Sequence, residues 1–547
     1  MIQAIPIHRN PLTPNRPGRS IPMNTNTNSL MNWRLNFHTL ICFIAFFISA
    51  PSIHAQESST KTSAKPYIFG AKHCTGCHDQ PSKKNDNCRM TEWLTWNNLD
   101  KHRIAFDWFD DDKKKTPSGI RAQTIAENLG ITNLHQARQC LGCHSLPLET
   151  NTPTSYFDNE MQRAREGVTC VACHGGSKEW VIEHVAASDP SWKNTSGPQR
   201  WEKFGMVDLK NPVTQARQCV SCHVGDPDQK LGRKISHEMY AAGHPPLPGL
   251  EVSSYIAEQP RHWLTSTEKP DNAHGSARPV DLLAVSGLVT LRTELALIRD
   301  YISNHANTNQ SQDGGPELSL FDCVACHHDI TKNKSKWRQS QRIAGAPGRP
   351  RLPQWPRTLV RFSLILADPQ NWKTSENQIS ELLLRVDQEL SKSPYGIEST
   401  DISKTLNKAI EQLDRVLGLL DHRWNKTGKL TNDSSLQSLR IFLDSLLDHQ
   451  PIASFDYDTA RQIGWAIRTS ISNGTKPIAP GMIPDLEELD LLLGLKLRPN
   501  HSPTDSPPAK SEQTSVTDLL KDRLKLANAY EPSQFRKVLE RIRNTIK

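Results

Sequence analysis

The sequence QARQCLGCH, from Gln136 to His144, recurs 79 positions later as QARQCVSCH, from Gln215 to His223. Both copies end in CxxCH, in which two cysteines three positions apart precede a histidine. At the composition of this chain, about 0.01 copies of CxxCH are expected by chance. The chain nevertheless contains five copies. They are Cys74, Cys77 and His78; Cys140, Cys143 and His144; Cys170, Cys173 and His174; Cys219, Cys222 and His223; and Cys323, Cys326 and His327.

The spacing of CxxCH suits covalent attachment of haem. On one helical turn, positions i, i+3 and i+4 lie on the same face, so both sulfurs can bond one haem while the histidine binds its iron. A structural zinc site normally uses two CxxC pairs, and five CxxC disulfides would leave the five histidines unexplained. The sequence therefore predicts five covalently attached c-type haems. Each motif histidine is the expected proximal iron ligand, and no other metal is predicted.

The composition indicates a chain that buries few apolar side chains for its length. Hydrophobic residues make up 36% of the chain, aromatic residues make up 6%, and 37 residues are proline. Five haems would supply the missing apolar core. The formal charge of +8 includes four arginines within residues 1–55, and no Lys/Arg run is interleaved with aromatic residues. Nucleic-acid binding is therefore not expected.

The N-terminal segment has the features of a secretory leader. Leu40–Ala50 is an apolar run of 11 residues, which is too short to span a bilayer comfortably and suits a signal-peptide core. Arg34 precedes this run, and a plausible cleavage site follows Ala55. We expect residues 1–55 to be removed and the mature protein to be periplasmic. An uncleaved membrane anchor is the alternative, and only that alternative predicts membrane association.

The sixth iron ligand separates an electron carrier from a catalyst. Residues 56–345 contain ten histidines outside the motifs, whereas the 202 residues after Gly345 contain three. This enrichment favours bis-histidine haems over methionine ligation, because the same region has only four methionines. The ten histidines are His73, His102, His135, His184, His237, His244, His262, His274, His305 and His328.

Sequence context selects five of these ten histidines as candidate distal ligands. His102 follows an apolar helical stripe, and His184 lies ten residues after a motif histidine. His237 and His244 flank a turn that contains glycine and proline. His262 stands beside a tryptophan, so it is either a ligand or a packed histidine.

Four segments resemble the multihaem cytochromes of the c-552/c-554 type, including long bacterial members with a helical extension. The segments are CRMTEWLTWNNLDKHRIAF, EGVTCVACHGG, HEMYAAGHPPL and FDCVACHHD, and they span roughly residues 70–330. The resemblance implies bis-histidine haems packed closely for electron transfer. It also matches His102, His184 and His244 to the distal ligands of that family. Shorter relatives carry four haems, so the resemblance does not assign a distal ligand to each of five irons.

Two cysteines lie outside the motifs. Cys42 falls within the leader, and Cys88 lies 14 residues after Cys74. Cys88 is predicted to pack as a buried thiol. A distal thiolate or an intermolecular disulfide is the alternative for Cys88.

The sequence changes character after residue 345. Residues 56–345 form the predicted pentahaem domain, and the proline-rich, basic stretch 346–357 is predicted as a linker. Residues 358–496 place apolar residues at helical spacing and predict a helical domain. Residues 497–515 are a second predicted linker, and 516–547 a helical tail. We expect the helical domain to pack on the haem region; docking of a redox partner is the alternative.

These patterns predict a mainly α fold with much irregular loop, organised by five haems and followed by an α-helical domain. The favoured function is an exported pentahaem electron-transfer cytochrome. Its expected partners are redox proteins, either other cytochromes or a membrane quinone-linked complex. The alternative is a multihaem oxidoreductase that acts on a small nitrogen compound at one haem with an open distal site. A third hypothesis gives the C-terminal helices an assembly role at a membrane complex.

Overall fold

The computed structural model divides the chain into two compact units, Met1–Lys61 and Thr62–Lys547. The residues that it describes all lie in the second unit, so the predicted leader falls outside them. The described residues are 70–81, 88–110, 116–145, 165–175, 178–185, 192, 194–227, 233–264, 276–307, 317–323, 326–327, 349–392, 400–431, 434–448, 455–472, 479–495, 525–527 and 529–546.

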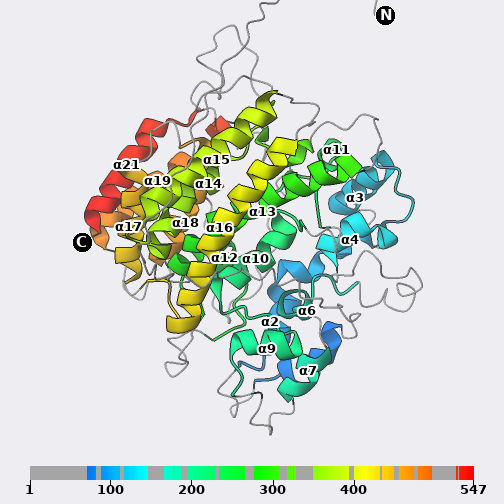
Figure 1. Ribbon diagram of the computed structural model, residues 1–547. Coiled ribbons are helices and arrows are strands. Elements are labelled where there is room, and N and C mark those ends of the chain that lie inside the picture. The colour runs from blue at the N-terminus through cyan, green and yellow to red at the C-terminus, as the bar shows by residue number, and fades with distance from the viewer. Residues whose placement is uncertain are drawn as a thin grey trace, which may run out of the picture. The chain divides into compact units, whose positions relative to one another are not determined.

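The described residues form helices and irregular segments, with no strand among them, which confirms the predicted mainly α fold. Short helices dominate up to residue 264, and longer helices follow (Figure 1). The short helices are α1 (Thr75–His78), α2 (Glu92–Leu99), α3 (Pro117–Asn128), α4 (Arg138–His144), α6 (Cys170–His174), α7 (Lys178–Val185), α9 (Gly197–Phe204), α10 (Pro212–His223), α11 (His237–Ala241) and α12 (Val252–Glu258). The later helices are α13 (Pro279–Asn307), α14 (Gln354–Ala367), α15 (Trp372–Lys392), α16 (Thr400–Thr427), α17 (Ser435–Leu447), α18 (Tyr457–Ser472), α19 (Ile483–Leu493) and α21 (Pro532–Thr545). Short 3-10 turns lie at η1 (Ala71–Cys74), η2 (Lys101–Ile104), η3 (Asp107–Phe109), η5 (Leu134–Gln136), η6 (Leu318–Leu320) and η11 (Pro480–Met482).

Helix α10 shows how local sequence positions a motif. The Asn211 side chain caps the helix by accepting hydrogen bonds from the amides of Val213 and Thr214, at 2.9 and 3.5 Å. Pro212 follows at the first helical position, where its fixed φ suits the helix and its missing amide hydrogen costs nothing. The helix continues through CVSCH and ends at His223. The fourth motif is therefore part of a continuous three-turn helix.

One hydrophobic core extends from Val213 in α10 to Ile546 after α21. Helix α13 is central to it and packs against α10, α12, α14 and α16. Nearly every residue of α13 from Val280 to Ile298 is buried, including the polar Asp281, Ser286 and Glu294. Gly287 allows α14 to approach, because a Cβ at this position would lie 2.5 Å from the Cβ of Leu359.

Apolar packing is much sparser near the first three motifs. One small cluster of buried residues consists of Phe106, Phe109, Ala122 and Leu141. A second cluster consists of Val171 and Trp180. The segments that carry these motifs thus have little core of their own among the described residues.

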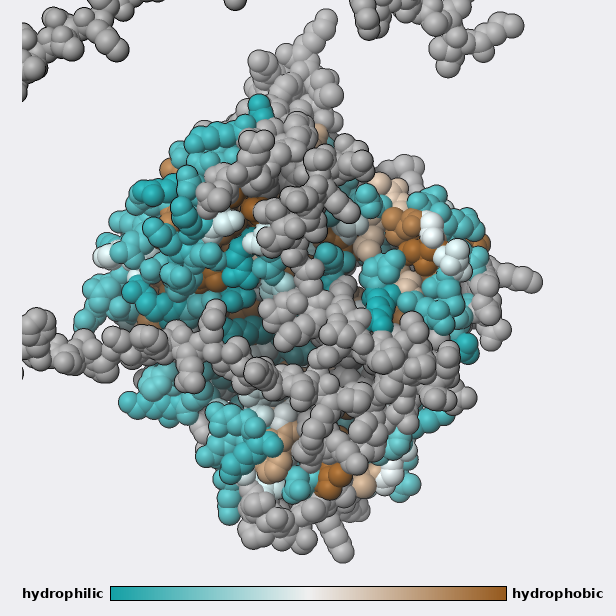
Figure 2. Space-filling model, turned by 45° about the vertical axis from the view of Figure 1, so that its right-hand side comes forward, coloured by the Kyte–Doolittle hydropathy of each residue, from teal (hydrophilic) through white to brown (hydrophobic). Residues whose placement is uncertain are grey.

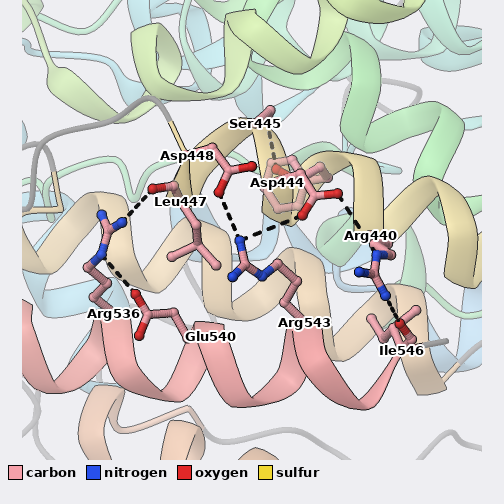
Figure 3. A network of polar contacts seen from close by, with 10 residues as sticks. Arg440, Asp444, Ser445, Leu447, Asp448, Arg536, Glu540, Arg543 and Ile546 are labelled. Carbon is pink, nitrogen blue, oxygen red and sulfur yellow. Dashed lines mark hydrogen bonds and ion pairs between the residues drawn. The ribbon is translucent and has the colours of Figure 1, made fainter.

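The C-terminal helix α21 is fixed to α17 by charged side chains (Figure 3). Arg543 lies 2.9 Å from a carboxylate oxygen of Asp448 and 3.7 Å from one of Asp444. Arg536 donates to the carbonyl of Leu447, which is one of the free carbonyls at the end of α17. These contacts attach α21 to the C-terminal end of α17.

The core does not follow the predicted division of the chain. Helices α10, α12 and α13, from the predicted haem region, share it with α14 to α21. Helix α14 begins at Gln354, inside the predicted linker 346–357, because Leu352 and Trp355 are buried there. The last residues of the predicted linker are therefore helical in the structure, and some of their apolar side chains are buried.

The surface is mostly polar. Figure 2 shows a face on which hydrophilic residues predominate and apolar residues form small areas among the coloured residues. Within the described ranges, no helix combines the length and the apolar character needed to cross a membrane.

Candidate haem-binding sites

Each CxxCH motif lies on a helical turn, and the motifs are numbered here as sites 1 to 5 in chain order. At sites 1 to 4, the helices α1, α4, α6 and α10 end at the motif histidine. At site 5, the amides of Cys326 and His327 donate to the carbonyl of Cys323 at 3.2 and 2.7 Å. Both sulfurs and the imidazole of each motif therefore emerge from one turn, as attachment to a single haem requires.

Each motif histidine faces one of the five candidate distal histidines. The separation between ring centres is nearly the same in all five pairs, from 6.2 to 6.5 Å. The pairs are His78 with His184, His144 with His244, His174 with His262, His223 with His102, and His327 with His237. The two histidines of each pair lie between 88 and 121 positions apart in the sequence.

 All five pairs are thus contacts between distant parts of the sequence.

The ring separation fits one iron atom between two imidazoles. Two metal–imidazole bonds of about 2.0–2.1 Å, plus roughly 1.1 Å from each nitrogen to its ring centre, add up to about 6.3 Å. Direct hydrogen bonding between two imidazoles would bring the ring centres closer than two metal bonds do. The residues present therefore fit five haem irons with two histidine ligands each.

Most of these histidines are oriented through Nδ1, which leaves Nε2 free for a metal. In three candidate distal histidines and one motif histidine, the Nδ1 atom lies near a backbone carbonyl oxygen. The Nδ1 contacts are His144 to Ala105 at 2.9 Å, His184 to Val181 at 2.8 Å, His244 to Pro245 at 2.7 Å and His262 to Pro260 at 3.4 Å. Such contacts fix the tautomer and the ring orientation of a metal-binding histidine.

Two further histidines are oriented by a carboxylate. His78 Nδ1 lies 2.8 Å from Glu92, and this hydrogen bond raises the pKa of His78. Asp100 accepts hydrogen bonds from both the amide and the Nδ1 of His102, at 2.9 Å each. Burial lowers the pKa of His102, but the hydrogen bond and the charge of Asp100 raise this pKa by more than burial lowers it. The net shift is therefore upward. A carboxylate behind an imidazole increases its basicity as a metal ligand.

The motif histidines of sites 3 and 4 are partly buried, and this burial favours their neutral form. Burial lowers the pKa of His174 to about 4, and the same cause lowers that of His223 to about 4. Neutral imidazole is the form that binds a metal. Beside site 3, the buried Thr169 hydroxyl has no hydrogen-bond partner among the described residues, which leaves it available to a polar group of a bound haem.

A family model described as cytochrome c554 and c-prime matches residues 73–175. This similarity supports a c-type cytochrome. The match covers the motifs of sites 1, 2 and 3, whereas sites 4 and 5 and the helices from α10 onward lie beyond it. Comparison of the chain with curated proteins and with solved structures gives no match.

The attachment motifs of this chain are close neighbours. The side chains of Cys74 (site 1) and Cys170 (site 3) are close enough for each to shift the pKa of the other, downward for Cys74 and upward for Cys170. The sulfur of Cys143 (site 2) lies 3.9 Å from the carbonyl oxygen of Cys222 (site 4). Site 1 therefore adjoins site 3, and site 2 adjoins site 4.

Sites 3 and 4 are also joined directly. The side-chain amide of Gln218 donates to the carbonyl of Ala172, inside the motif of site 3, at 2.6 Å. Burial raises the pKa of Cys219 to about 12, and the nearby Cys173 adds to this shift. Gln218 is the last residue of the second QARQ segment, whereas Gln139, its counterpart in the first, is exposed. The two copies of the repeated segment thus make different contacts.

Helix α11 links site 5 to site 2. Its first residue, His237, faces His327 of site 5, and His244 after its end faces His144 of site 2. Tyr240 lies between them in sequence, with its ring 6.3 Å from that of His244. Burial raises the pKa of Tyr240, and the nearby Cys323 of site 5 adds to the rise. Contacts between neighbours thus follow the order of sites 1, 3, 4, 2 and 5.

The motif cysteines differ in exposure along this order. Cys77 at site 1 and both Cys323 and Cys326 at site 5 are exposed, whereas the motif cysteines of sites 2, 3 and 4 are partly buried. The two ends of the series are therefore the more accessible attachment sites.

The remaining histidine candidates have other contacts or lie outside the described residues. His135 uses Nε2 to bind the carbonyl of Phe109 at 2.7 Å, and its ring stacks on Phe106. His73 Nδ1 lies 3.3 Å from the carbonyl of Gly70. The side chains of His274, His305 and His328 lie outside the described part of the chain.

Cys88 is partly buried rather than fully buried, and it donates a hydrogen bond to the sulfur of Met90 at 3.1 Å. Its sulfur also lies near His78 and Glu92, with the ligand atoms of the three residues within 4.8 Å of one another. His78 already faces His184 at site 1. Cys88 is therefore a neighbour of site 1, in contact with the groups that orient the motif histidine.

The sequence did not single out the residues that support the histidines. Asp100 lies two positions before His102 and caps the turn η2, so an acidic residue at such spacing is a usable signal. Glu92 is 14 positions from His78, and Gln218 is 46 positions from Ala172. Contacts at these separations depend on tertiary structure, and no local pattern predicts them.

Proposed function

We propose that the protein is an exported electron-transfer cytochrome with five c-type haems, each bound by two histidines. The observation that supports this function best is the common separation of 6.2–6.5 Å between the rings of the five histidine pairs. The ten motif cysteines would hold the haems through thioether bonds. The paired histidines would bind the irons from both sides.

Two histidine ligands on every iron favour electron transfer over catalysis at iron. A haem exchanges electrons through its iron, and the axial ligands set its reduction potential. With both axial positions filled by protein, no position remains for a substrate. The Nδ1 contacts hold the rings in place, and the carboxylates behind His78 and His102 favour the oxidised iron at sites 1 and 4.

The contacts between motifs support an electron path through sites 1, 3, 4, 2 and 5. Cys74 lies beside Cys170 at sites 1 and 3, and Cys143 lies beside Cys222 at sites 2 and 4. Gln218 joins sites 3 and 4, and α11 joins sites 2 and 5. The exposed cysteines at sites 1 and 5 make these sites the proposed points of exchange with redox partners. Other cytochromes or a membrane quinone-linked complex are the proposed partners.

Export is part of the proposal and rests on the sequence. Haem attachment through CxxCH together with the apolar run Leu40–Ala50 supports removal of residues 1–55 and a periplasmic location. The mass of the mature protein tests this directly. We expect a chain that begins at Gln56 and carries the mass of five haems, and a chain that retains residues 1–55 would contradict cleavage.

Paramagnetic resonance of the oxidised protein tests the proposed ligands. We expect five low-spin ferric irons and no high-spin signal. The ring planes are within 27° of parallel at sites 1 and 5, and 69° to 89° apart at the other three. Near-perpendicular ligand planes give strongly anisotropic low-spin signals, so three irons should show them and two should give rhombic signals.

A matched pair of variants sharpens this test. His262→Ala removes the ring that faces His174 and should convert one iron to high spin. His135→Ala removes a partly buried histidine that binds the carbonyl of Phe109 and faces no motif histidine among the described contacts. This variant should leave all five irons low-spin. A high-spin iron in the unaltered protein that shifts on addition of nitrite or hydroxylamine would instead support an oxidoreductase with an open site.

A further inference from the structure

Arg233 connects the attachment motifs of sites 2 and 4. Its Nε donates to the carbonyl of Gly142, between the two cysteines of site 2, at 2.9 Å. Its Nη1 donates to the hydroxyl of Ser221, between the two cysteines of site 4, at 2.7 Å. One guanidinium thus holds the turns that carry two neighbouring haem attachment sites.

The guanidinium is buried, and its contacts with described residues include no carboxylate. Arg233 is 3% exposed, and the ion pairs between described residues do not involve it. Both of its described hydrogen bonds go to neutral oxygens. A buried arginine stays charged, and a buried charge without a counter-charge is costly unless the site uses it.

The positive charge lies between two attachment turns. Its two hydrogen bonds reach residues that stand between the cysteines of site 2 and between those of site 4. The guanidinium is therefore fixed close to both groups that these turns would hold.

We propose that Arg233 is a redox-tuning residue, whose fixed charge raises the reduction potentials of the haems at sites 2 and 4. Reduction of a ferric iron adds one negative charge to the haem, and a nearby cation in a medium of low dielectric constant stabilises the reduced form. Arg233 would thereby favour the reduced form of the haems at sites 4 and 2, which lie inside the proposed path. This inference rests on the proposed five-haem function, and a haem count by mass tests that function separately.

Potentiometric titration of full-length holoprotein variants tests the inference. Arg233→Gln removes the charge and retains a hydrogen-bonding side chain. We expect the reduction equilibrium of two haems to shift about tenfold toward the oxidised form, which corresponds to about 59 mV for one electron. Arg233→Lys keeps the charge and should retain potentials close to those of the unaltered protein.

A matched control removes the adjacent charge instead. Lys234 follows Arg233 in the chain but is exposed, so Lys234→Gln should change each reduction equilibrium less than twofold. Arg233→Met serves as a second charge-removing variant, because an apolar side chain of similar length leaves no buried amide behind.

Each outcome decides the inference. Lowered potentials in Arg233→Gln or Arg233→Met with five haems attached, and near-normal potentials in Arg233→Lys, support it. Unchanged potentials in a charge-removing variant overturn it, and so does a shift in Arg233→Lys as large as that in Arg233→Gln. Loss of haem from both charge-removing variants also overturns it, because Arg233 then serves to hold the motifs in place for attachment. Fewer than five haems in the unaltered protein would contradict the proposed function itself.

Discussion

The segments around sites 1 to 3 and the helices from α10 to α21 differ in what holds them together. The first have two small apolar clusters, built on Phe106 and on Val171, among their described residues. The second share a continuous core of buried Leu, Ile, Val and Phe side chains. The contrast teaches that one chain can combine a part whose core is expected to come from its cofactors with a part whose core comes from its own side chains.

Production of the protein without haem should give the largest difference between the two parts. In a full-length chain produced without haem attachment, the segments up to residue 210 should be cleaved by a protease about tenfold faster, or more, than α13 to α21. Helices α13 to α21 carry no haem motif, whereas the first part would depend on haem for most of its apolar contacts, so loss of haem should expose the first part selectively. Limited proteolysis followed by mass spectrometry measures the two rates. Equal protection of both parts would show that the first part does not need its cofactors.

Core substitutions should have the next largest effect, and they should act on the second part. Leu489→Ala in α19 removes a side chain that is 0% exposed, and it should cost about 2–5 kcal/mol of unfolding free energy. Leu491→Ala, two positions along the same helix, removes a side chain that is 79% exposed and should change that energy by less than about 0.5 kcal/mol. Denaturant unfolding followed by circular dichroism measures both. Similar losses in the two variants would contradict the assigned packing of α19.

The carboxylate behind His102 offers a smaller test within the haem region. Asp100→Asn removes the negative charge that faces Nδ1 of His102, so the imidazole becomes a weaker ligand for oxidised iron. We expect the reduction equilibrium of one haem to shift roughly two- to tenfold toward the reduced form in potentiometric titration. Asp107→Asn, which removes a carboxylate paired with Arg103 at 3.4 Å, is the control and should leave it unchanged. A shift of the opposite sign in Asp100→Asn would rule out the assigned role of Asp100.

The smallest effect should come from the ion pairs that attach α21. Arg543→Met removes contacts to Asp448 and Asp444 at a half-exposed position (Figure 3). The expected loss is about 0.5–1 kcal/mol of unfolding free energy, and high salt should reduce the difference. Lys537→Met, at an exposed position of the same helix, should have no measurable effect. A loss from Arg543→Met that persists in full at high salt would indicate packing rather than charge.

The sequence predicted the elements better than their assembly. The CxxCH spacing predicted a helical turn at each motif, and helical periodicity predicted that the chain after residue 358 is helical, as α14 to α19 show. Sequence context also selected the five histidines that the structure places opposite the motif histidines. Which histidine faces which motif could not be predicted, because each pair is formed by tertiary folding between residues far apart in the chain.

The boundary between the two parts is where the sequence-based prediction and the structure differ most. The sequence placed it near residue 345, after the last motif, whereas the core begins at Val213 and includes all of α13. The run Val280–Ile298 has apolar residues on every helical face and only three charged residues, Asp281, Arg292 and Glu294. Such a helix is expected to be covered on most sides by other elements. That pattern is visible in the sequence, but the cysteine motifs on either side of it suggested a haem region throughout.

Helix α10 belongs to both parts, and this has a practical consequence. Its Val213, Ala216 and Val220 are buried in the helical core, while its last turn carries Cys219, Cys222 and His223. Loosening of α13 to α21 should therefore disturb the surroundings of the haem proposed for site 4. The visible absorption of the protein would then report the unfolding of helices that carry no haem motif themselves.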